Sequence, residues 1–396
     1  MVEEIQALKR DLTRLGEIAL LYRSNAQSRV LEHALFTAGL PYRVYGGLRF
    51  FERAEVKHAL AYLRLVAAPA DDNAFLRVVN FPARGIGART LEGLQDAAQA
   101  AGRNLYETAL ASPGKVAPFI ALIESLREEC AGLTLAGKVE HVVAKSGLLD
   151  HYRREREGAE RLENLGELLN AAATFSAEDT ALESGEDADP LIAFLTHAAL
   201  EAGEHQAGEG QDALQLMTMH SAKGLEFNAV FVSGLEEGLF PHEQSVLERD
   251  GLEEERRLMY VALTRARQRL YLSFAQTRLL HGQTRYNLPS RFIDELPQGL
   301  LKWLTPRFAA KRKPSTFTAG AFTRAVKRDP RFGGAPAGTG GAPIGFRIGQ
   351  NVVHAKFGSG VIVDAEGQGT DARVQVNFGR EGVKWLAVAV AKLQAA

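Results

Sequence analysis

The sequence has little cysteine, little net charge and no long apolar run. Its 396 residues include one cysteine, Cys130, which excludes an internal disulfide and a cysteine-based metal cluster and is typical of a reducing compartment. No run approaches the roughly 18 apolar residues that a membrane helix needs. The acidic start, Met1-Val2-Glu3-Glu4, lacks the apolar core of a signal peptide. We therefore expect a cytoplasmic protein without a membrane segment.

The formal net charge of −1 does not point to a nucleic-acid partner, but the charges are unevenly distributed. Residues 302–331 contain nine Lys or Arg and one Asp, whereas residues 178–189 contain six acidic residues and no base. Each segment fits a solvated linker or loop as well as it fits a binding surface.

Apolar patterning predicts an α/β layer interrupted by helices. The apolar run from Glu17 to Arg23 is typical of a buried parallel strand, and strand texture returns at 213–219, 229–233 and 269–274. A helix from Leu252 to Arg267 is indicated by an apolar stripe that reaches Leu270. Between these parts, helical periodicity is found at 56–65, 75–79, 90–100, 120–130, 139–146 and 161–175.

The length of the chain favours two or three domains. We expect residues 1–38 and 211–306 to form one α/β lobe around a helical insertion at 39–210. Residues 307–344, rich in Gly, Pro and basic side chains, are typical of a flexible linker. Residues 345–396 predict a barrel of about five strands, including 351–354, 360–364, 373–378 and 383–388.

A polar turn at residues 217–227, MTMHSAKGLEF, follows a predicted strand. Ligands collect beyond the carboxyl ends of strands in open α/β sheets, where we expect this turn to lie. His220, Ser221 and Lys223 suit phosphates, and Glu226 suits a ribose hydroxyl. An ordinary loop with a charged tip explains the pattern equally, since the Gly-rich run of a phosphate loop is absent.

Arg265 lies on the flank of the predicted helix. There either its aliphatic stem covers apolar surface, or its guanidinium points into a cleft. The neighbouring Thr264 and Arg267 favour an anion site.

Taken in order, three segments resemble UvrD-, PcrA- and Rep-type DNA helicases of superfamily 1. Residues 218–227 resemble helicase motif V, residues 254–266 resemble motif VI, and residues 21–29 resemble the segment before the inserted subdomain. Residues 45–52 and 354–358 add to the likeness. The resemblance implies an incomplete α/β RecA-like motor lobe interrupted by an all-α inserted subdomain, followed by a small Tudor- or SH3-like β-barrel.

The resemblance also assigns roles in ATP-dependent DNA unwinding in the 3′ to 5′ direction during repair. Arg265 becomes the arginine finger that reaches the γ-phosphate of ATP. The remaining nucleotide contacts are Glu226 and Gly224. The single-strand contacts are His220, Ser221, Lys223 and Arg23. ATP and Mg²⁺ are the implied cofactors, and no metal ligand is expected in this chain.

The segment Pro82–Thr90 contains Gly-Ile-Gly before a predicted helix that starts near Thr90. Glycines let backbone N–H groups approach a phosphate, although a lone Gly-Ile-Gly is usually a turn. The resemblance implies a grip on duplex DNA by Arg84, Gly85, Gly87 and Thr90, with Arg89 as a further candidate.

Two more features gain a role from the resemblance. The hairpin at 277–285 implies a strand-separation pin with His281 at its tip, where the family carries an aromatic ring. The terminal barrel implies binding to RNA polymerase. Of Phe357, Phe378 and Trp385, at least two are expected in its core.

No Gly-x-x-x-x-Gly-Lys-Ser/Thr and no Asp-Glu-x-x-Asp occurs in the 396 residues. The family carries both on an amino-terminal lobe. We therefore expect this chain to be the carboxy-terminal part of a helicase and to be inactive by itself. The alternative is a catalytically inactive module that binds DNA and RNA polymerase.

Overall fold

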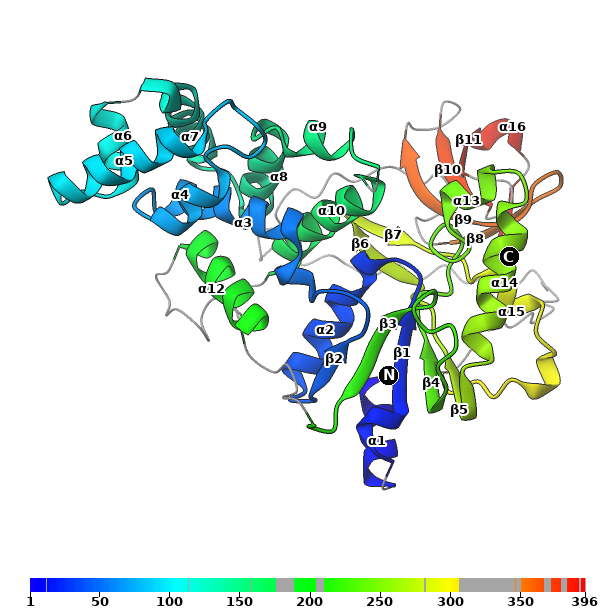
Figure 1. The fold of residues 1–396 in the computed structure, drawn as a ribbon. Helices are drawn as coiled ribbons and strands as arrows, with labels where there is room; N and C mark the ends of the chain where they lie inside the picture. Colours follow the sequence, from blue (N-terminus) through cyan, green and yellow to red (C-terminus); the bar gives the residue numbers. More distant parts are fainter. Residues whose placement is uncertain are drawn as a thin grey trace, which may run out of the picture. The chain divides into compact units, whose positions relative to one another are not determined.

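A computed structural model describes the chain in two units, Met1–Arg285 and Tyr286–Ala396 (Figure 1). The described residues are 1–11, 13–112, 114–156, 158–175, 189–203, 210–280, 283–305, 346, 350–366, 372–378, 383–391 and 393–395. The whole predicted linker 307–344, the acidic residues 178–188 and His281 at the hairpin tip lie outside the described residues.

The first unit contains a five-stranded parallel sheet of order β2-β3-β1-β4-β5. The strands are β1 (Ile18–Tyr22), β2 (Tyr42–Val44), β3 (Leu214–Thr218), β4 (Phe227–Val232) and β5 (Ala266–Leu272). All five residues of β1 are buried, as a central strand covered on both faces requires. β1 precedes the helical block in the sequence and pairs with both β3 and β4, which follow it. The sheet is therefore built from the two parts of the chain that flank the block. The predicted interrupted α/β layer is confirmed.

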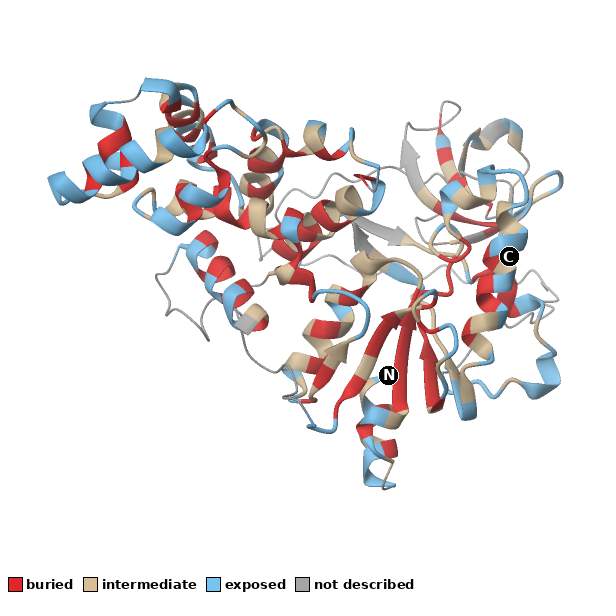
Figure 2. Cartoon of the chain, viewed as in Figure 1, coloured by how far each residue is buried: buried red, intermediate tan, exposed pale blue. Residues whose placement is uncertain are grey.

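Helices pack against this sheet. Helices α1 (Val2–Arg10) and α2 (Ser28–Thr37) bury Ile5, Leu8 and Leu35 in one core with alternate residues of β1. Helix α14 (Gly251–Leu263) contacts β4 and β5. Figure 2 shows β1, β3 and β4 as mostly buried, whereas the edge strand β5 exposes residues 267–270.

The helical block has its own core. Phe75, Phe119 and Ile123 are fully buried within it, and side-chain caps start several of its helices. Its helices are α3 (Ala54–Ala67), α4 (Asp72–Val78), α5 (Ala88–Ala101), α6 (Leu105–Ala111), α7 (Ala117–Cys130), α8 (Leu135–Lys145), α9 (Leu148–Tyr152), α10 (Gly158–Thr174) and α12 (Pro190–Gly203). Single-turn helices are η1 (Leu15–Glu17), η2 (Asn25–Gln27), η3 (Phe50–Glu52) and η4 (Gly114–Val116).

The second unit is a five-stranded antiparallel sheet of order β11-β10-β9-β8-β12. Its strands are β8 (Asn351–His354), β9 (Gly358–Glu366), β10 (Arg373–Asn377), β11 (Val383–Ala387) and β12 (Gln394–Ala395). Val352, Ile362, Val374, Val376 and Phe378 form its core. The remaining elements are the hairpin β6 (Thr277–Leu280) and β7 (Gln283–Tyr286), α13 (Glu243–Leu247), α15 (Arg291–Asp294), η5 (Gln298–Leu300) and α16 (Val388–Ala391).

Three expectations need correction. The helix predicted from Leu252 to Arg267 ends at Leu263, and Leu270 of the supposed helical stripe lies in β5. Residues from Ala266 onward pair with β4 instead of continuing the helix, and the Thr264 hydroxyl donates to carbonyls of the last helical turn. The helix predicted near Thr90 begins at Ala88. Strand β2 extends the parallel sheet beyond residue 38, into the range predicted to be helical.

Among the described residues, no single helix is long and apolar enough to cross a membrane. The two helical segments Leu105–Ala111 and Gly114–Cys130 are long and apolar enough only when taken together, and they are bent by 101° to each other.

Candidate functional site

The register of the parallel sheet places the predicted site residues at two opposite edges. Strands β1 and β3 end side by side, so Arg23 and His220, which follow them, lie at the carboxyl edge. Strands β4 and β5 begin side by side, so Glu226 and Arg265, which precede them, lie at the amino edge. The expectation that the whole turn lies beyond the carboxyl ends was therefore wrong for Glu226. Residues 219–226 must return to the start of β4, because β4 runs parallel to β3.

Arg265 lies between α14 and β5 and is half-buried. Its guanidinium donates to the Val261 carbonyl at 2.9 Å, the Leu225 carbonyl at 2.9 Å and the Thr264 hydroxyl at 3.0 Å. These three acceptors are neutral, so they orient the guanidinium without cancelling its charge. The Leu225 contact joins motif VI to the motif V turn, and the arrangement can accept an anion.

The other predicted nucleotide contacts lie in the exposed part of the same turn. Gly224 and Glu226 are both exposed, and so is Lys223, which was predicted to contact single-stranded DNA. Gly224 has φ +85°, a left-handed conformation that a side chain would strain. The Phe227 N–H donates to the Arg265 carbonyl at 2.9 Å, which holds Glu226 near Arg265 at the amino edge.

At the carboxyl edge, His220 is exposed and Ser221 is half-buried. Partial desolvation and the nearby Arg23 charge lower the pKa of His220, against the smaller opposite effect of Glu255. The imidazole is therefore mainly neutral at pH 7. The Ser221 and Thr218 hydroxyls are 2.9 Å apart, which fixes the start of the turn.

Arg23 is held by protein partners. Its Nε and Nη2 donate to Glu255 at 3.0 and 2.7 Å, and this carboxylate is almost fully buried. Burial raises the pKa of Glu255, but the hydrogen bonds and charge of Arg23, together with hydrogen bonds from the His242 N–H and Ser245, outweigh burial and lower it. The main-chain N–H of His242 donates to the same carboxylate at 3.1 Å.

The His242 imidazole extends this group of charges to the helical block, lying 3.3 Å from Glu163 of α10. The hydrogen bond to Glu163 raises the pKa of His242. Ser24, next to Arg23, also donates to Glu163. Sequence reasoning missed Glu255, His242 and Glu163, because they come together only through tertiary packing. The strongest available signal was Glu255 within the motif VI string.

Arg84 of the Gly-Ile-Gly segment is also tied to the protein. It donates to the carbonyls of Val78, Pro82 and Ser146, each at 3.1 Å, and to the Tyr62 hydroxyl at 2.6 Å. These bonds make Arg84 a positioning residue for the loop. The Asn80 side chain adds two acceptor contacts, to the N–H groups of residues 84 and 86.

The loop presents exposed backbone above this scaffold. Ile86 is buried as an anchor, whereas Gly85, Gly87 and Arg89 are exposed. Gly85 has φ +74°, and Gly87 is the N-cap of α5. Thr90 is half-buried in the first turn of α5, where its N–H donates to the Gly87 carbonyl at 3.0 Å. Exposed N–H groups at a helix start suit an anion such as phosphate.

The combination of an interrupted parallel sheet and a small antiparallel sheet is matched by two family models of UvrD-type helicases. A family model for the UvrD-like helicase C-terminal domain matches residues 1–277, and one for the PcrA/UvrD tudor domain matches residues 348–394. The chain belongs to the UvrD-like helicase family.

Individual relatives agree. The chain is 48% identical over 392 residues to DNA helicase II of Escherichia coli (strain K12), a match that covers 96% of this chain and 52% of that protein. It is 38% identical over 406 residues to ATP-dependent DNA helicase PcrA of Bacillus subtilis (strain 168), with the same coverage of each chain. The chain thus spans about half the length of the curated relatives it matches.

Proposed function

We propose that this chain supplies the second motor lobe, a duplex grip and a protein-binding tail to an ATP-dependent DNA helicase that moves 3′ to 5′. Arg265 acts as the arginine finger on an ATP whose phosphates and Mg²⁺ are held by another lobe. Glu226 and Gly224 contact the nucleotide. The single strand runs past Arg23, His220, Ser221 and Lys223, and the duplex contacts Gly85, Gly87 and Thr90, positioned by Arg84.

The orientation of Arg265 is the observation that carries this proposal. Its guanidinium is fixed by neutral acceptors beside the exposed Glu226, at the edge opposite Arg23 and His220. Such preorganised charge lowers the barrier to phosphoryl transfer because it needs no reorganisation during the reaction. The spatial separation of the two groups suits a motor, in which nucleotide and strand occupy different sites.

The test uses a polypeptide that carries this sequence together with a lobe bearing a phosphate loop. Arg265→Ala is expected to lower DNA-stimulated ATP hydrolysis by about 10³-fold or more, with the affinity for single-stranded DNA unchanged. Arg267→Ala is the matched control, since Arg267 on β5 is paired with Glu17 and lies outside the proposed site. Equal losses in both variants would remove the finger assignment.

The purified 396-residue chain is proposed to hydrolyse no ATP, because it contains no Gly-x-x-x-x-Gly-Lys-Ser/Thr. The same absence favours the second candidate function for the isolated polypeptide, a DNA-binding module without catalysis. A DNA-stimulated ATPase in the purified chain, abolished by Arg265→Ala, contradicts both statements.

The antiparallel unit is proposed to bind a protein, with RNA polymerase as the partner implied by the family. Phe378 lies in its core with Phe357 packed against it, whereas Trp385 remains 43% exposed. An exposed tryptophan is a common anchor of protein interfaces. Trp385→Ala is expected to reduce capture of purified RNA polymerase while leaving DNA affinity unchanged. Unchanged capture would exclude Trp385 as the anchor.

A further inference from the structure

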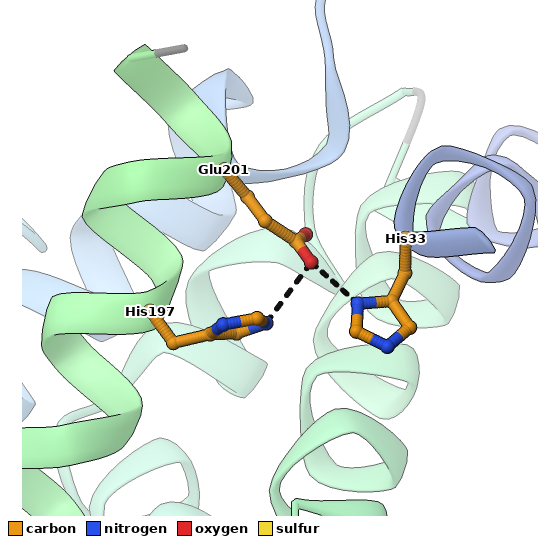
Figure 3. Close-up of side chains that lie close together, drawn as sticks. All are labelled: His33, His197 and Glu201. Atoms are coloured by element: carbon orange, nitrogen blue, oxygen red, sulfur yellow. Dashed lines mark hydrogen bonds and ion pairs between the residues drawn. The ribbon is translucent and has the colours of Figure 1, made fainter. Parts of the chain in front are cut away.

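A group of two imidazoles and one carboxylate lies outside the proposed nucleotide and DNA sites. Glu201 and His197 lie one turn apart on α12, and His33 lies on α2 (Figure 3). The His33 Nδ1 is 2.6 Å and the His197 Nε2 is 2.9 Å from the same oxygen, Oε1 of Glu201. We propose that these three side chains bind a divalent first-row metal ion such as Zn²⁺, which joins α2 to α12.

The donor set suits such an ion. Zn²⁺ is bound by imidazole nitrogen and carboxylate oxygen, and three protein ligands leave a fourth position for solvent. The three ligand atoms all lie within 4.8 Å of one another. Ligand atoms in a tetrahedral zinc site are about 3.3 Å apart, so the two short contacts must widen by less than about 1 Å, and the two imidazole nitrogens, within 4.8 Å of each other, must approach by up to about 1.5 Å. Small side-chain rotations supply that change.

The carboxyl end of α12 favours a cation. Glu201 lies in the last turn of α12, where the helix dipole stabilises positive charge. Arg49 lies nearby and donates to the main-chain carbonyls of Glu201 and Ala202, which holds the end of the helix in place.

The group is open to solvent at His33 and buried at His197 and Glu201. The His33 side chain is 42% exposed, whereas those of His197 and Glu201 are 11% and 6% exposed. An ion can therefore enter past His33 and meet two buried ligands. Phe36 and Phe175 contact the His197 ring edge-on and at a tilt, which fixes its orientation. Sequence spacing gave no hint, since His33 and Glu201 are 168 positions apart.

The site would connect the parallel-sheet lobe to the last helix of the helical block. Metal binding to the folded state alone stabilises that state, so the melting temperature should rise with metal concentration. The prediction for the isolated chain, without an affinity tag that binds metal, is one Zn²⁺ per chain and an upward shift in melting temperature.

The test is a Zn²⁺ titration by calorimetry, together with thermal unfolding, for the chain and for His33→Asn, His197→Asn and Glu201→Gln. Each variant is expected to bind Zn²⁺ more than about 100-fold more weakly, beyond the loss that follows removal of an outer-shell partner. His141→Asn is the matched control, because His141 faces the single carboxylate of Glu129 and should leave binding unchanged. Equal affinity in all variants overturns the proposal.

A gain-of-function variant covers the case in which those substitutions disturb folding. His33→Cys replaces an imidazole by a thiolate, which suits Zn²⁺ and Co²⁺. With Co²⁺ it should give sulfur-to-metal charge-transfer absorption that the unsubstituted chain lacks. No such absorption, or no Zn²⁺ binding by the unsubstituted chain, means that the group is only a proton-bridged ion pair and sinks the proposal.

Discussion

Arg23 and Glu255 form a forked ion pair across 232 positions of sequence, with the shorter contact at 2.7 Å. The pair ties the end of β1 to α14, the helix that precedes Arg265. It therefore links the strand edge of the proposed motor lobe to the helix that positions its finger.

Glu255→Gln is expected to lower the free energy of unfolding by about 1–3 kcal/mol, since it weakens a charge-assisted hydrogen bond to a buried group. Urea denaturation measures this change. Glu254→Gln is the control, because its pair with Arg257 is exposed and should contribute less than about 1 kcal/mol. Equal losses of unfolding free energy in both variants would show that the Arg23–Glu255 pair contributes no more than an exposed pair.

The pH dependence of the same pair follows from the lowered pKa of Glu255. A carboxylate with a depressed folded-state pKa stabilises the protein above its ordinary value of 4.5, and that stability is lost as the pH falls through the folded-state pKa. Glu255→Gln should therefore flatten the acid limb of stability below that value. An unchanged acid limb contradicts the assignment.

His242 predicts a dependence of opposite sign. Its pKa is raised by Glu163, so its contribution is fully present below the ordinary value of 6.5 and is lost as the pH rises through the folded-state pKa. His242→Asn should remove a fall in melting temperature above that value. The control is His354→Asn in the second unit, which leaves the fall in place.

Gly87→Ala separates ligand approach from backbone strain. Gly87 has φ −86°, and no atom lies within 4 Å of an added Cβ, so stability should change by less than about 1 kcal/mol. If a duplex phosphate approaches this backbone, affinity for a duplex with a 3′ tail should fall several-fold. Gly93→Ala, equally open and further along α5, should leave affinity unchanged. Unchanged affinity for Gly87→Ala removes the proposed grip.

Lys223 and His220 should differ in their salt dependence. Lys223 is exposed and charged, so Lys223→Ala is expected to reduce the slope of log affinity for single-stranded DNA against log salt by about 0.7. The pKa of His220 is lowered, so at pH 7.5 its imidazole is neutral, and His220→Ala should reduce affinity without changing the slope. Equal slope changes would show that His220 binds as a cation.

Apolar periodicity predicted the interrupted parallel sheet, because buried central strands such as β1 are continuous apolar runs. Periodicity predicted the wrong helix end near Arg265, because apolar residues of β5 such as Leu270 fall at the spacing of the apolar stripe on α14. The motif strings identified His220, Glu226 and Arg265 but could not show that they divide between two edges. That division depends on strand register, which no local pattern encodes.

Arg84 illustrates the same limit. A basic residue beside Gly-Ile-Gly reads as a phosphate ligand, yet its guanidinium uses four of its five N–H groups on three carbonyls and the Tyr62 hydroxyl, whereas Arg265 makes three such bonds. Its role is set by residues distant in sequence, such as Ser146. The sequence did not reveal the group of His33, His197 and Glu201 for the same reason, because these residues come together only through tertiary packing.

Because β4 starts beside Glu226 and ends near the Arg23 edge, one six-residue strand separates the two proposed ligands. That strand is about 20 Å long and almost wholly buried, so it resists bending. Under the proposed function, a displacement of Arg265 by the nucleotide would be carried to the DNA side as a tilt of the whole sheet. Movement along the DNA would then depend on rotation of the sheet as a rigid body rather than on successive movements of loops.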